Sequence, residues 1–410
     1  MECRIRFCGI IFFLNSLQQE IFGGNSDFGI RQSQSYDGVY LKIRTSDSIA
    51  SITAYIPGKP QEELERELGI SGSIKLASNE NPWGPSPRAV RAIRSKLLNI
   101  HRYPDGSCFY LVDALSKKLG VDPSEVILGN GSSEIVDFLV KAFVQEGDEV
   151  ITSHPSFLMY QKFVQVRGGI NFIVPLRDMR HDLVVIKEMI SDKTKIIFLD
   201  NPNNPTGTII RPVDLYQFLS DIPETVIVVI DEAYIDFADK QQRVDVYSLI
   251  RNISERCPVV FLRTFSKAYG LAGLRIGYAL MARGIAASLH KVRQPFNINL
   301  MAQVGALAAL DDEEYYERTL SRTQEGLEFL SREVEVLGCK SYPSQANFVL
   351  VDVLGNADQL YNAMLQQGVI VRSMSTYGFD SCIRVTVGTE EENKRFLRSL
   401  ADCLSTLKYV

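Results

Sequence analysis

The sequence is poor in histidine and lacks paired-cysteine motifs. Only four histidines occur among 410 residues, and none has HxxxH or HExxH spacing, which argues against a histidine-rich metal site. The seven cysteines are scattered and odd in number, and no CxxC is present. We therefore expect reduced thiols, a cytoplasmic protein and no bound metal.

Dense basic runs and membrane-length apolar runs are missing too. The net charge is −5, so a polyanionic partner such as nucleic acid is not expected. The apolar run within "MECRIRFCGIIFFLNSL" is too short to span a bilayer, and no small-x-small cleavage site follows it. We expect no membrane partner, and we predict that residues 1–48 form a poorly ordered extension.

What the chain does contain is a regular alternation of short apolar runs and helix-like segments. With 45% hydrophobic and 23% charged residues, its composition is that of a soluble globular protein long enough for two domains. Short β-rich runs separated by helical segments predict an α/β fold with a mostly parallel seven-stranded sheet. The runs are "VIL" (126–128), "EVIT" (149–152), "NFIV" (171–174), "IIFL" (196–199), "VIVVI" (226–230), "VVFL" (259–262) and "IGYAL" (276–280).

The C-terminal part has a different pattern. A long helical stretch, "EYYERTLSRTQEGLEFLSREVEVL", precedes the isolated strands "NFVLVDV" and "CIRVTVG", which indicates a smaller α+β domain. Upstream, "SPRAVRAIRSKL" predicts a helix with Ser86 as N-cap and Pro87 at the first position. We predict that residues 49–95 and 300–410 form the small domain and that residues 96–299 form the large one.

Polar groups follow four of the predicted strands at the point where each strand ends. The segments are "GNGSSE", "DNPNNPTG", "DEAY" and "RTFSK". In an open parallel sheet, ligands bind beyond the carboxyl ends of the strands. The four segments are therefore candidates for one shared site.

Each segment also has an ordinary structural explanation. "GNGSSE" fits a strand–helix turn and "NPNNPTG" a rigid turn, while Asp231 fits a helix N-cap and Lys267 a surface lysine. Together these explanations are weak, because the set suits an aldehyde cofactor with a basic ring nitrogen and a phosphate. A lysine forms the Schiff base, a carboxylate pairs with the ring nitrogen, and hydroxyls, an arginine and a helix start hold the phosphate.

Nine motifs give this sequence a specific resemblance. Over residues 50–405 it resembles the fold-type I aminotransferases that use pyridoxal 5′-phosphate (PLP), and among them the histidinol-phosphate aminotransferase family. The motifs are "SNENPWGPSP", "HRYPDG", "GNGSSE", "HPSFLMY", "NPNNPTG", "DEAYIDF", "RTFSKAYGLAGLRIGY", "SQANFVL" and "CIRVTVGT".

The resemblance implies a role for each cofactor-facing residue. Lys267 would bind PLP covalently and move a proton during transfer. Asp231 would pair with the ring nitrogen, Tyr234 and Asn204 would contact the ring hydroxyl, and Phe157 would stack on the ring. The residues expected to hold the phosphate are Ser132, Ser133, Thr264, Ser266, Arg275 and, in a homodimer, Tyr103 of the partner subunit.

The resemblance also implies the reaction and the substrate contacts. L-Histidinol phosphate would pass its amino group to 2-oxoglutarate, giving imidazole-acetol phosphate and glutamate in histidine biosynthesis. Arg384 would bind the α-carboxylate of glutamate, with Asn347 in support. Arg372 and Tyr55 would contact the distal phosphate of histidinol phosphate.

Three other functions remain open at this point. Two are PLP enzymes on the same scaffold, an aromatic amino acid aminotransferase and an O-phosphothreonine decarboxylase. The third is a non-catalytic binding protein with this fold, which the joint presence of Lys267, Asp231, Arg275 and Arg384 disfavours.

Overall fold

The computed structural model describes residues 45–54, 58–246, 249–250 and 257–409. The chain divides into Met1–Ser46 and Asp47–Val410, and the elements below belong to the second unit. Nearly all of the predicted N-terminal extension lies outside the described residues, as does Tyr55. No helix among the described residues is long and apolar enough to cross a membrane.

A seven-stranded sheet with the order β2-β8-β7-β6-β5-β3-β4 forms the centre of the fold. β8 runs antiparallel to its two neighbours, β2 and β7, and all other neighbouring strands of this sheet are parallel. Each of the seven predicted strands is confirmed, and so is the mostly parallel α/β fold. The strands are β2 (Val126–Gly129), β3 (Glu149–His154), β4 (Ile170–Pro175), β5 (Thr194–Asp200), β6 (Ile227–Asp231), β7 (Val259–Thr264) and β8 (Gly277–Met281).

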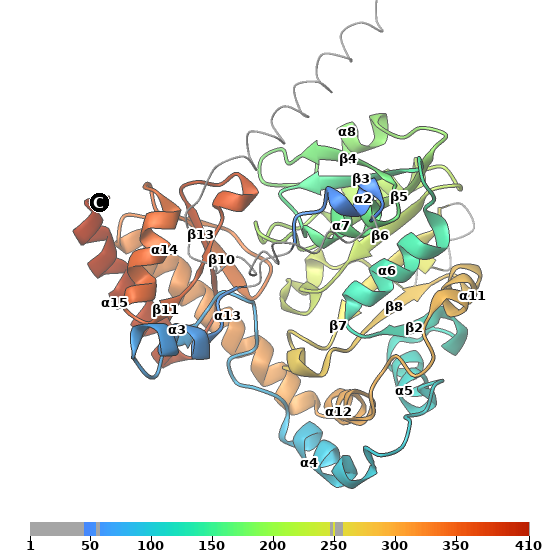
Figure 1. Cartoon of the computed structure of the whole chain (residues 1–410), viewed down its shortest axis with the longest axis horizontal. Helices are drawn as coiled ribbons and strands as arrows, with labels where there is room; N and C mark the ends of the chain where they lie inside the picture. Colours follow the sequence, from blue (N-terminus) through green and yellow to red (C-terminus); the bar gives the residue numbers. More distant parts are fainter. Residues whose placement is uncertain (1–44, 55–57, 247–248, 251–256, 410) are drawn as a thin grey trace, which may run out of the picture. The chain divides into compact units, whose positions relative to one another are not determined.

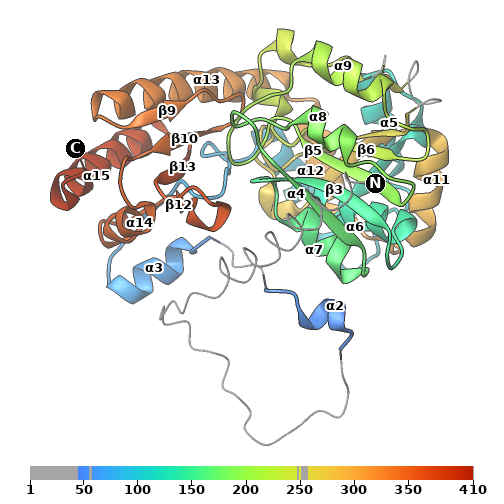
Figure 2. The same cartoon turned by 90° about the horizontal axis from the view of Figure 1, so that it is seen from above.

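Both faces of this sheet are buried, which explains why its strands are apolar throughout. In β6, Ile227 and Val229 face one hydrophobic core while Val228 and Ile230 face the other. Figure 2 shows α7 and α9 on opposite sides of the strands. One face is covered by α6 (Ser132–Phe143), α7 (Met159–Val166) and α11 (Arg283–Val292), and the other by α5 (Phe109–Leu119), α8 (Leu183–Glu188), α9 (Pro212–Ser220) and α12 (Leu300–Leu310).

The strand register brings the predicted functional residues to one edge. Asp200 at the end of β5 is the partner of Asp231 at the end of β6. Thr264 at the end of β7 is the partner of Gly277, which also pairs with Gly129 of β2. The polar segments that follow these strands therefore meet at the same edge of the sheet.

A second, four-stranded sheet has the order β12-β13-β10-β9, and a two-stranded pair joins β1 to β11. The hydrophobic core of the four-stranded sheet includes residues of α13, α14 and α15. Figure 1 shows these helices beside β10 and β13. The predicted long helix and both predicted strands are confirmed as α13, β10 and β13. The bounds are β1 (Ile74–Lys75), β9 (Lys340–Tyr342), β10 (Phe348–Asp352), β11 (Val369–Ile370), β12 (Arg372–Ser373), β13 (Cys382–Thr386), α3 (Gln61–Leu68), α13 (Glu313–Val336), α14 (Ala357–Gln366) and α15 (Glu390–Leu407).

The predicted helix after Ser86 is also confirmed, as α4 (Pro87–Lys96). The Ser86 side chain accepts hydrogen bonds from two backbone N–H groups of the first turn, and Pro87 occupies the first turn. Ala89 of α4 lies in the same core as the large sheet and α12. Ile74 of β1 lies in the core of the four-stranded sheet. The domain boundaries at residues 48, 95 and 299 stay a prediction. A short helix, α2, spans Asp47–Ala50.

Candidate active site

Lys267 lies just past β7, at the edge where the polar segments meet. Its Nζ donates a hydrogen bond to the backbone oxygen of Ser78 (3.2 Å) and lies 5.6 Å from the centre of the Tyr234 ring. Burial lowers the pKa of the Lys267 amine to about 8, and the nearby Arg384 charge acts in the same direction. About half of such an amine is neutral at pH 8, and the neutral form is the one that acts as a nucleophile or a proton acceptor.

Asp231 is a buried carboxylate at the end of β6. Its Oδ2 accepts a hydrogen bond from the hydroxyl of Tyr160 (2.8 Å), and its Oδ1 accepts one from the backbone N–H of Ala233 (3.0 Å). Burial raises the pKa of Asp231 to about 7. A cation beside it would restore the ionised form, so this site suits a positively charged ring nitrogen.

Tyr234 lies between two amides. Its hydroxyl oxygen accepts from Nδ2 of Asn79 (3.0 Å) and from Nδ2 of Asn204 (3.3 Å). The backbone N–H of Asn204 donates to Oδ2 of Asp200 (2.8 Å), which holds this loop against the sheet. Burial raises the pKa of Tyr234 to about 12, so the phenol keeps its proton at neutral pH.

Arg384 projects from β13 toward the same residues. Its guanidinium donates to the backbone oxygen of Ala77 (2.8 Å) and to the side-chain oxygen of Asn204, and it lies over the ring of Phe348. Asn347 donates to the backbone oxygen of Asn79 (3.1 Å). The predicted carboxylate-binding arginine is thus tied to the predicted cofactor-binding residues.

Arg372 is the partner of Arg384 across the β12–β13 pair. Residues paired in this way have side chains on the same face of a sheet. No carboxylate pairs with Arg372 in the part of the chain that the structure describes. The register therefore places two arginines opposite each other on one face of the sheet.

An anion-binding cradle forms where α6 begins. Gly131 at its N-terminus provides no side-chain cap, and Ser132 and Ser133 open the helix. The guanidinium of Arg275 reaches Gly131 so closely that a Cβ atom there would lie 2.5 Å from Nη2. Free helix N–H groups and an arginine together favour a phosphate.

The β7 hydroxyls complete this cradle. Thr264 donates to the Oγ of Ser266 (3.0 Å) and accepts from the Ser266 backbone N–H (3.1 Å). Their neighbour Gly277 lies against the start of α6, since a Cβ atom there would be 2.5 Å from the Ser132 nitrogen. The structure thus brings together all five phosphate residues predicted within one chain: Ser132, Ser133, Thr264, Ser266 and Arg275.

The two remaining aromatic residues are placed differently. Phe157 packs edge-on against Tyr160, with ring centres 5.3 Å apart, and so lies near Asp231. Tyr103 is 82% exposed and stacks on Phe296, with ring centres 4.7 Å apart. Its ring is therefore available to a second chain.

Two residues of the site were not predicted from the sequence. Tyr160 contacts Asp231, and Asn79 contacts Tyr234. Both lie inside quoted motifs, "HPSFLMY" and "SNENPWGPSP", but their contacts depend on how distant segments approach each other. A single sequence offers no signal for that.

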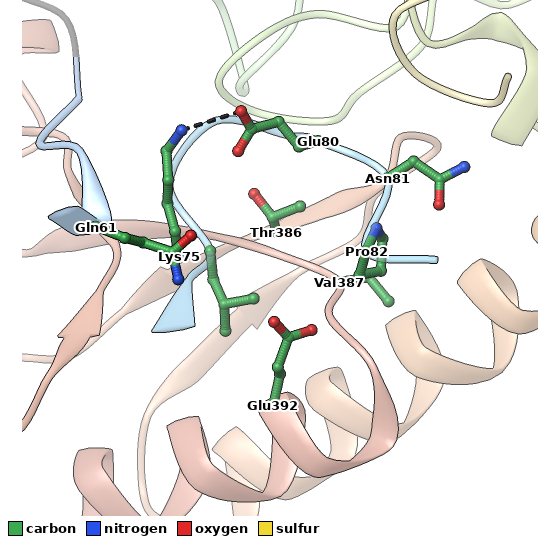
Figure 3. Close-up of a pocket in the computed structure, with 9 residues that line it drawn as sticks. Gln61, Lys75, Glu80, Asn81, Pro82, Thr386, Val387 and Glu392 are labelled. Atoms are coloured by element: carbon green, nitrogen blue, oxygen red, sulfur yellow. Dashed lines mark hydrogen bonds and ion pairs between the residues drawn. The ribbon is translucent and has the colours of Figure 1, made fainter. Parts of the chain in front are cut away.

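A cavity of about 320 Å³ borders the loop that carries Asn79. Figure 3 shows Lys75 and Glu80 facing each other above Thr386, with Glu392 of α15 on another wall. The Lys75 amine and the Glu80 carboxylate are 3.0 Å apart. Neither Lys267 nor Asp231 lines this cavity.

The residues at the strand ends fit PLP in their chemistry. The uncapped start of α6 with Arg275 suits its phosphate, Asp231 suits its ring nitrogen, and the low-pKa amine of Lys267 suits its aldehyde. No cluster of three or more metal ligands occurs among the described residues.

Fold and site together define a PLP-dependent transferase. The sequence model of the family "Aminotransferase class I and II" matches residues 71–400, and the chain belongs to this family. It is 60% identical to a histidinol-phosphate aminotransferase from Desulfotalea psychrophila, covering 91% of this chain and 98% of that protein. It is 45% identical to a histidinol-phosphate aminotransferase from Moorella thermoacetica, covering 88% of this chain and 92% of that protein. The fold is also similar to the crystal structure of histidinol-phosphate aminotransferase from Sinorhizobium meliloti in complex with PLP. The TM-score is 0.81 at 28% sequence identity, and the match covers 89% of this chain and 98% of that chain.

Proposed function

We propose that this chain transfers the amino group of L-histidinol phosphate to 2-oxoglutarate, giving imidazole-acetol phosphate and glutamate in histidine biosynthesis. The pair of arginines that the strand register places on one sheet face, Arg372 and Arg384, carries the proposal. Glutamate has two carboxylates, whereas histidinol phosphate has a phosphate and no carboxylate. A site that serves both substrates needs two anion contacts, of which one accepts either a carboxylate or a phosphate. The names of the similar proteins support the same substrate.

The residues at the strand ends divide the work of this reaction. When bound, PLP supplies the aldehyde that accepts the amino group and the ring that withdraws electrons from the substrate α-carbon. Lys267 holds the cofactor and carries the proton away from the α-carbon, which its lowered pKa makes feasible. Asp231 would keep the ring nitrogen protonated, and Ser132, Ser133, Thr264, Ser266 and Arg275 would anchor the phosphate.

A panel of amino donors tests this function. Purified protein loaded with PLP is mixed in turn with histidinol phosphate, phenylalanine, O-phosphothreonine and glutamate, and amino transfer is followed by the change in its visible spectrum. Transfer from histidinol phosphate above phenylalanine supports the proposal. A preference for phenylalanine would favour the aromatic aminotransferase, and release of CO₂ from O-phosphothreonine would favour the decarboxylase.

The substitution Arg372→Ala is expected to weaken use of histidinol phosphate selectively. Truncating one member of a desolvated charge pair costs about 2–5 kcal/mol, and Arg372 is partly exposed, so the lower end applies. The kcat/KM for histidinol phosphate should therefore fall about 30-fold, while any transfer from phenylalanine should change little. Arg398→Ala removes an exposed arginine of α15 and is the matched control. Equal losses on both donors would mean that Arg372 has a structural role. Tyr55, predicted to contact the same phosphate, stays a prediction.

We further propose that the active unit is a homodimer in which Tyr103 contributes to the partner's site. The segment around Tyr103 exposes a group of large apolar side chains, which a monomer would leave in water. A two-fold dimer would cover this surface in both copies. The group consists of Leu97, Leu98, Ile100, Tyr103, Phe109, Tyr110 and Phe296.

Mixing two defective variants tests the exchange. Tyr103→Phe should lower turnover about tenfold or more, since a hydrogen bond to a charged group contributes about 1.5–3 kcal/mol, and Lys267→Ala should be inactive. If Tyr103 serves the partner subunit, each mixed dimer gains one site with both native residues, and activity rises above that of either parent. If Tyr103 acts within its own chain, the mixture stays at the Tyr103→Phe level.

We propose a cytoplasmic location from the thiols. The five cysteines in the described part of the chain are all free and buried. Unpaired buried thiols are typical of reducing compartments.

A further inference from the structure

Asn79 is a buried residue of the loop between β1 and α4, and it contacts three separate segments. Its backbone N–H donates to Oγ1 of Thr386 (2.9 Å), and its carbonyl accepts from Asn347 (3.1 Å). Its side chain donates to the hydroxyl of Tyr234 (3.0 Å). It is 1% exposed and has a left-handed backbone, with φ +53°. Asparagine is among the few residues that adopt this conformation readily.

The hydrogen bonds of β13 fix the orientation of the Asn79 amide. The Thr386 hydroxyl already accepts from the Asn79 backbone, so its own proton goes to the side-chain oxygen of Asn79 (3.1 Å). The NH₂ group of Asn79 is then left facing Tyr234. In the same way, Arg384 donates to the side-chain oxygen of Asn204 and leaves that NH₂ group facing Tyr234. Arg384 and Thr386 are two residues apart on one strand and so lie on the same face.

Two amide donors leave the Tyr234 hydroxyl with one direction for its proton. A phenol oxygen has one proton and a limited capacity to accept, and Asn79 and Asn204 both donate to it. The proton must therefore point away from both amides. The Nζ of Lys267, the cofactor-binding lysine, lies over the face of the Tyr234 ring, 5.6 Å from its centre.

We propose that Asn79, oriented by Thr386, is a positioning residue that aims the Tyr234 O–H at the cofactor. This inference rests on the PLP-dependent function proposed above. Through Asn79, the "SNENP" loop would help to set the protonation of the Lys267–cofactor linkage. Because Thr386 orients Asn79, this effect would also depend on β13, the strand that carries Arg384.

The charged surroundings make a clean test possible. Lys267 is influenced by Arg384, Glu80, Arg275 and Lys75, and Tyr234 by Arg384, Asp231 and Asp200. Asn79 is uncharged, so Asn79→Gly alters none of these charges. Glycine also accepts a positive φ without strain. The substitution thus removes the amide and little else.

The readout is the pH midpoint of the change in visible absorption of PLP-loaded protein. Without the Asn79 amide, the Tyr234 O–H becomes a weaker donor and leaves more negative charge on the cofactor oxygen that accepts it. That charge stabilises the proton on the nitrogen of Lys267. A neutral hydrogen bond contributes about 1 kcal/mol, so the midpoint in Asn79→Gly should rise by about 0.5–1 pH unit.

Two further variants and one control separate positioning from a structural role. In a Tyr234→Phe background, Asn79→Gly should cause no further shift, because the hydroxyl it acts through is absent. Asn79→Asp keeps the shape of the side chain but accepts the Tyr234 proton, so it should shift the midpoint upward at least as far. Thr386→Ser keeps the orienting hydroxyl, so the midpoint should stay within about 0.2 pH unit of the wild-type value.

Two results would overturn the proposal. One is an unchanged midpoint in both Asn79→Gly and Asn79→Asp. The other is a shift of equal size with and without the Tyr234 hydroxyl. In both cases the protein would still bind PLP, so the proposed transamination would stand. If the wild-type protein took up no PLP, the proposed function and this inference would fail together.

Discussion

Lys267→Ala is expected to abolish amino transfer and to leave the protein without covalently bound PLP. The substitution removes the amine that we propose binds the cofactor and carries the proton. Proton transfer by a positioned side chain alone contributes about 10²–10⁴-fold, so turnover should fall by at least about three orders of magnitude. The measurement is single-turnover kinetics with histidinol phosphate, together with a visible spectrum.

Reduction with borohydride identifies the lysine that is used. The wild-type protein should yield one PLP-modified peptide, containing Lys267. Lys267→Arg keeps a cation but cannot replace the amine, so it should lack the modified peptide. Lys75→Ala removes another lysine whose charge reaches the site. This variant should still yield the PLP-modified peptide that contains Lys267. A modified peptide from any other lysine would contradict the assignment.

The same amine gives a pH signature. Its pKa of about 8 lies below that of an ordinary lysine, and only the neutral amine attacks an aldehyde. The rate at which cofactor-free protein takes up PLP should therefore rise with pH up to about 8 and then level off. A rate still rising steeply at pH 10 would mean an ordinary, exposed lysine.

Asp231→Asn is expected to have the second-largest effect. The amide cannot form an ion pair with the ring nitrogen, and loss of one partner from a buried pair costs about 3–5 kcal/mol. Turnover should fall by about two to four orders of magnitude. Glu224→Gln, which removes an exposed carboxylate just before β6, is the control and should keep full activity.

The melting temperature of cofactor-free protein distinguishes a role of Asp231 in the reaction from a structural role. The folded-state pKa of Asp231 is raised to about 7, so its carboxylate destabilises the cofactor-free protein increasingly as pH rises from about 4 to 7. At pH 8, cofactor-free Asp231→Asn should therefore melt at a higher temperature than cofactor-free wild type. A lower melting temperature in the variant would mean that Asp231 supports the fold rather than the reaction.

The strands of the large sheet were predictable because both of their faces are buried. A run such as "VIVVI" has no polar face, so its apolar pattern marks the strand directly. The two-residue strands β1, β11 and β12 were missed, because two residues carry no period. Their pairing comes from tertiary contacts rather than from local pattern.

The same distinction holds within the site. Asp231 and Thr264 end β6 and β7, Lys267 follows β7, and the parallel register brings such positions together. Asn79 comes from a loop whose partner, Thr386, lies more than 300 residues away along the chain. Tyr160 likewise reaches Asp231 from a helix. Neither contact has a local sequence signal, so neither residue could be assigned its place before the fold was known.

The pairing of β2 with β8 affects how the enzyme is made and maintained in the cell. The start of α6 follows β2, but its companions Arg275 and Gly277 lie far downstream, and Arg384 and Thr386 are synthesised almost last. A growing chain therefore cannot complete the phosphate cradle until β8 has been synthesised, so every new copy passes through a cofactor-free stage. Free PLP at a hundred times its Kd stabilises the folded form by about 2.7 kcal/mol. A copy that has bound PLP is thereby expected to unfold less often than a cofactor-free copy.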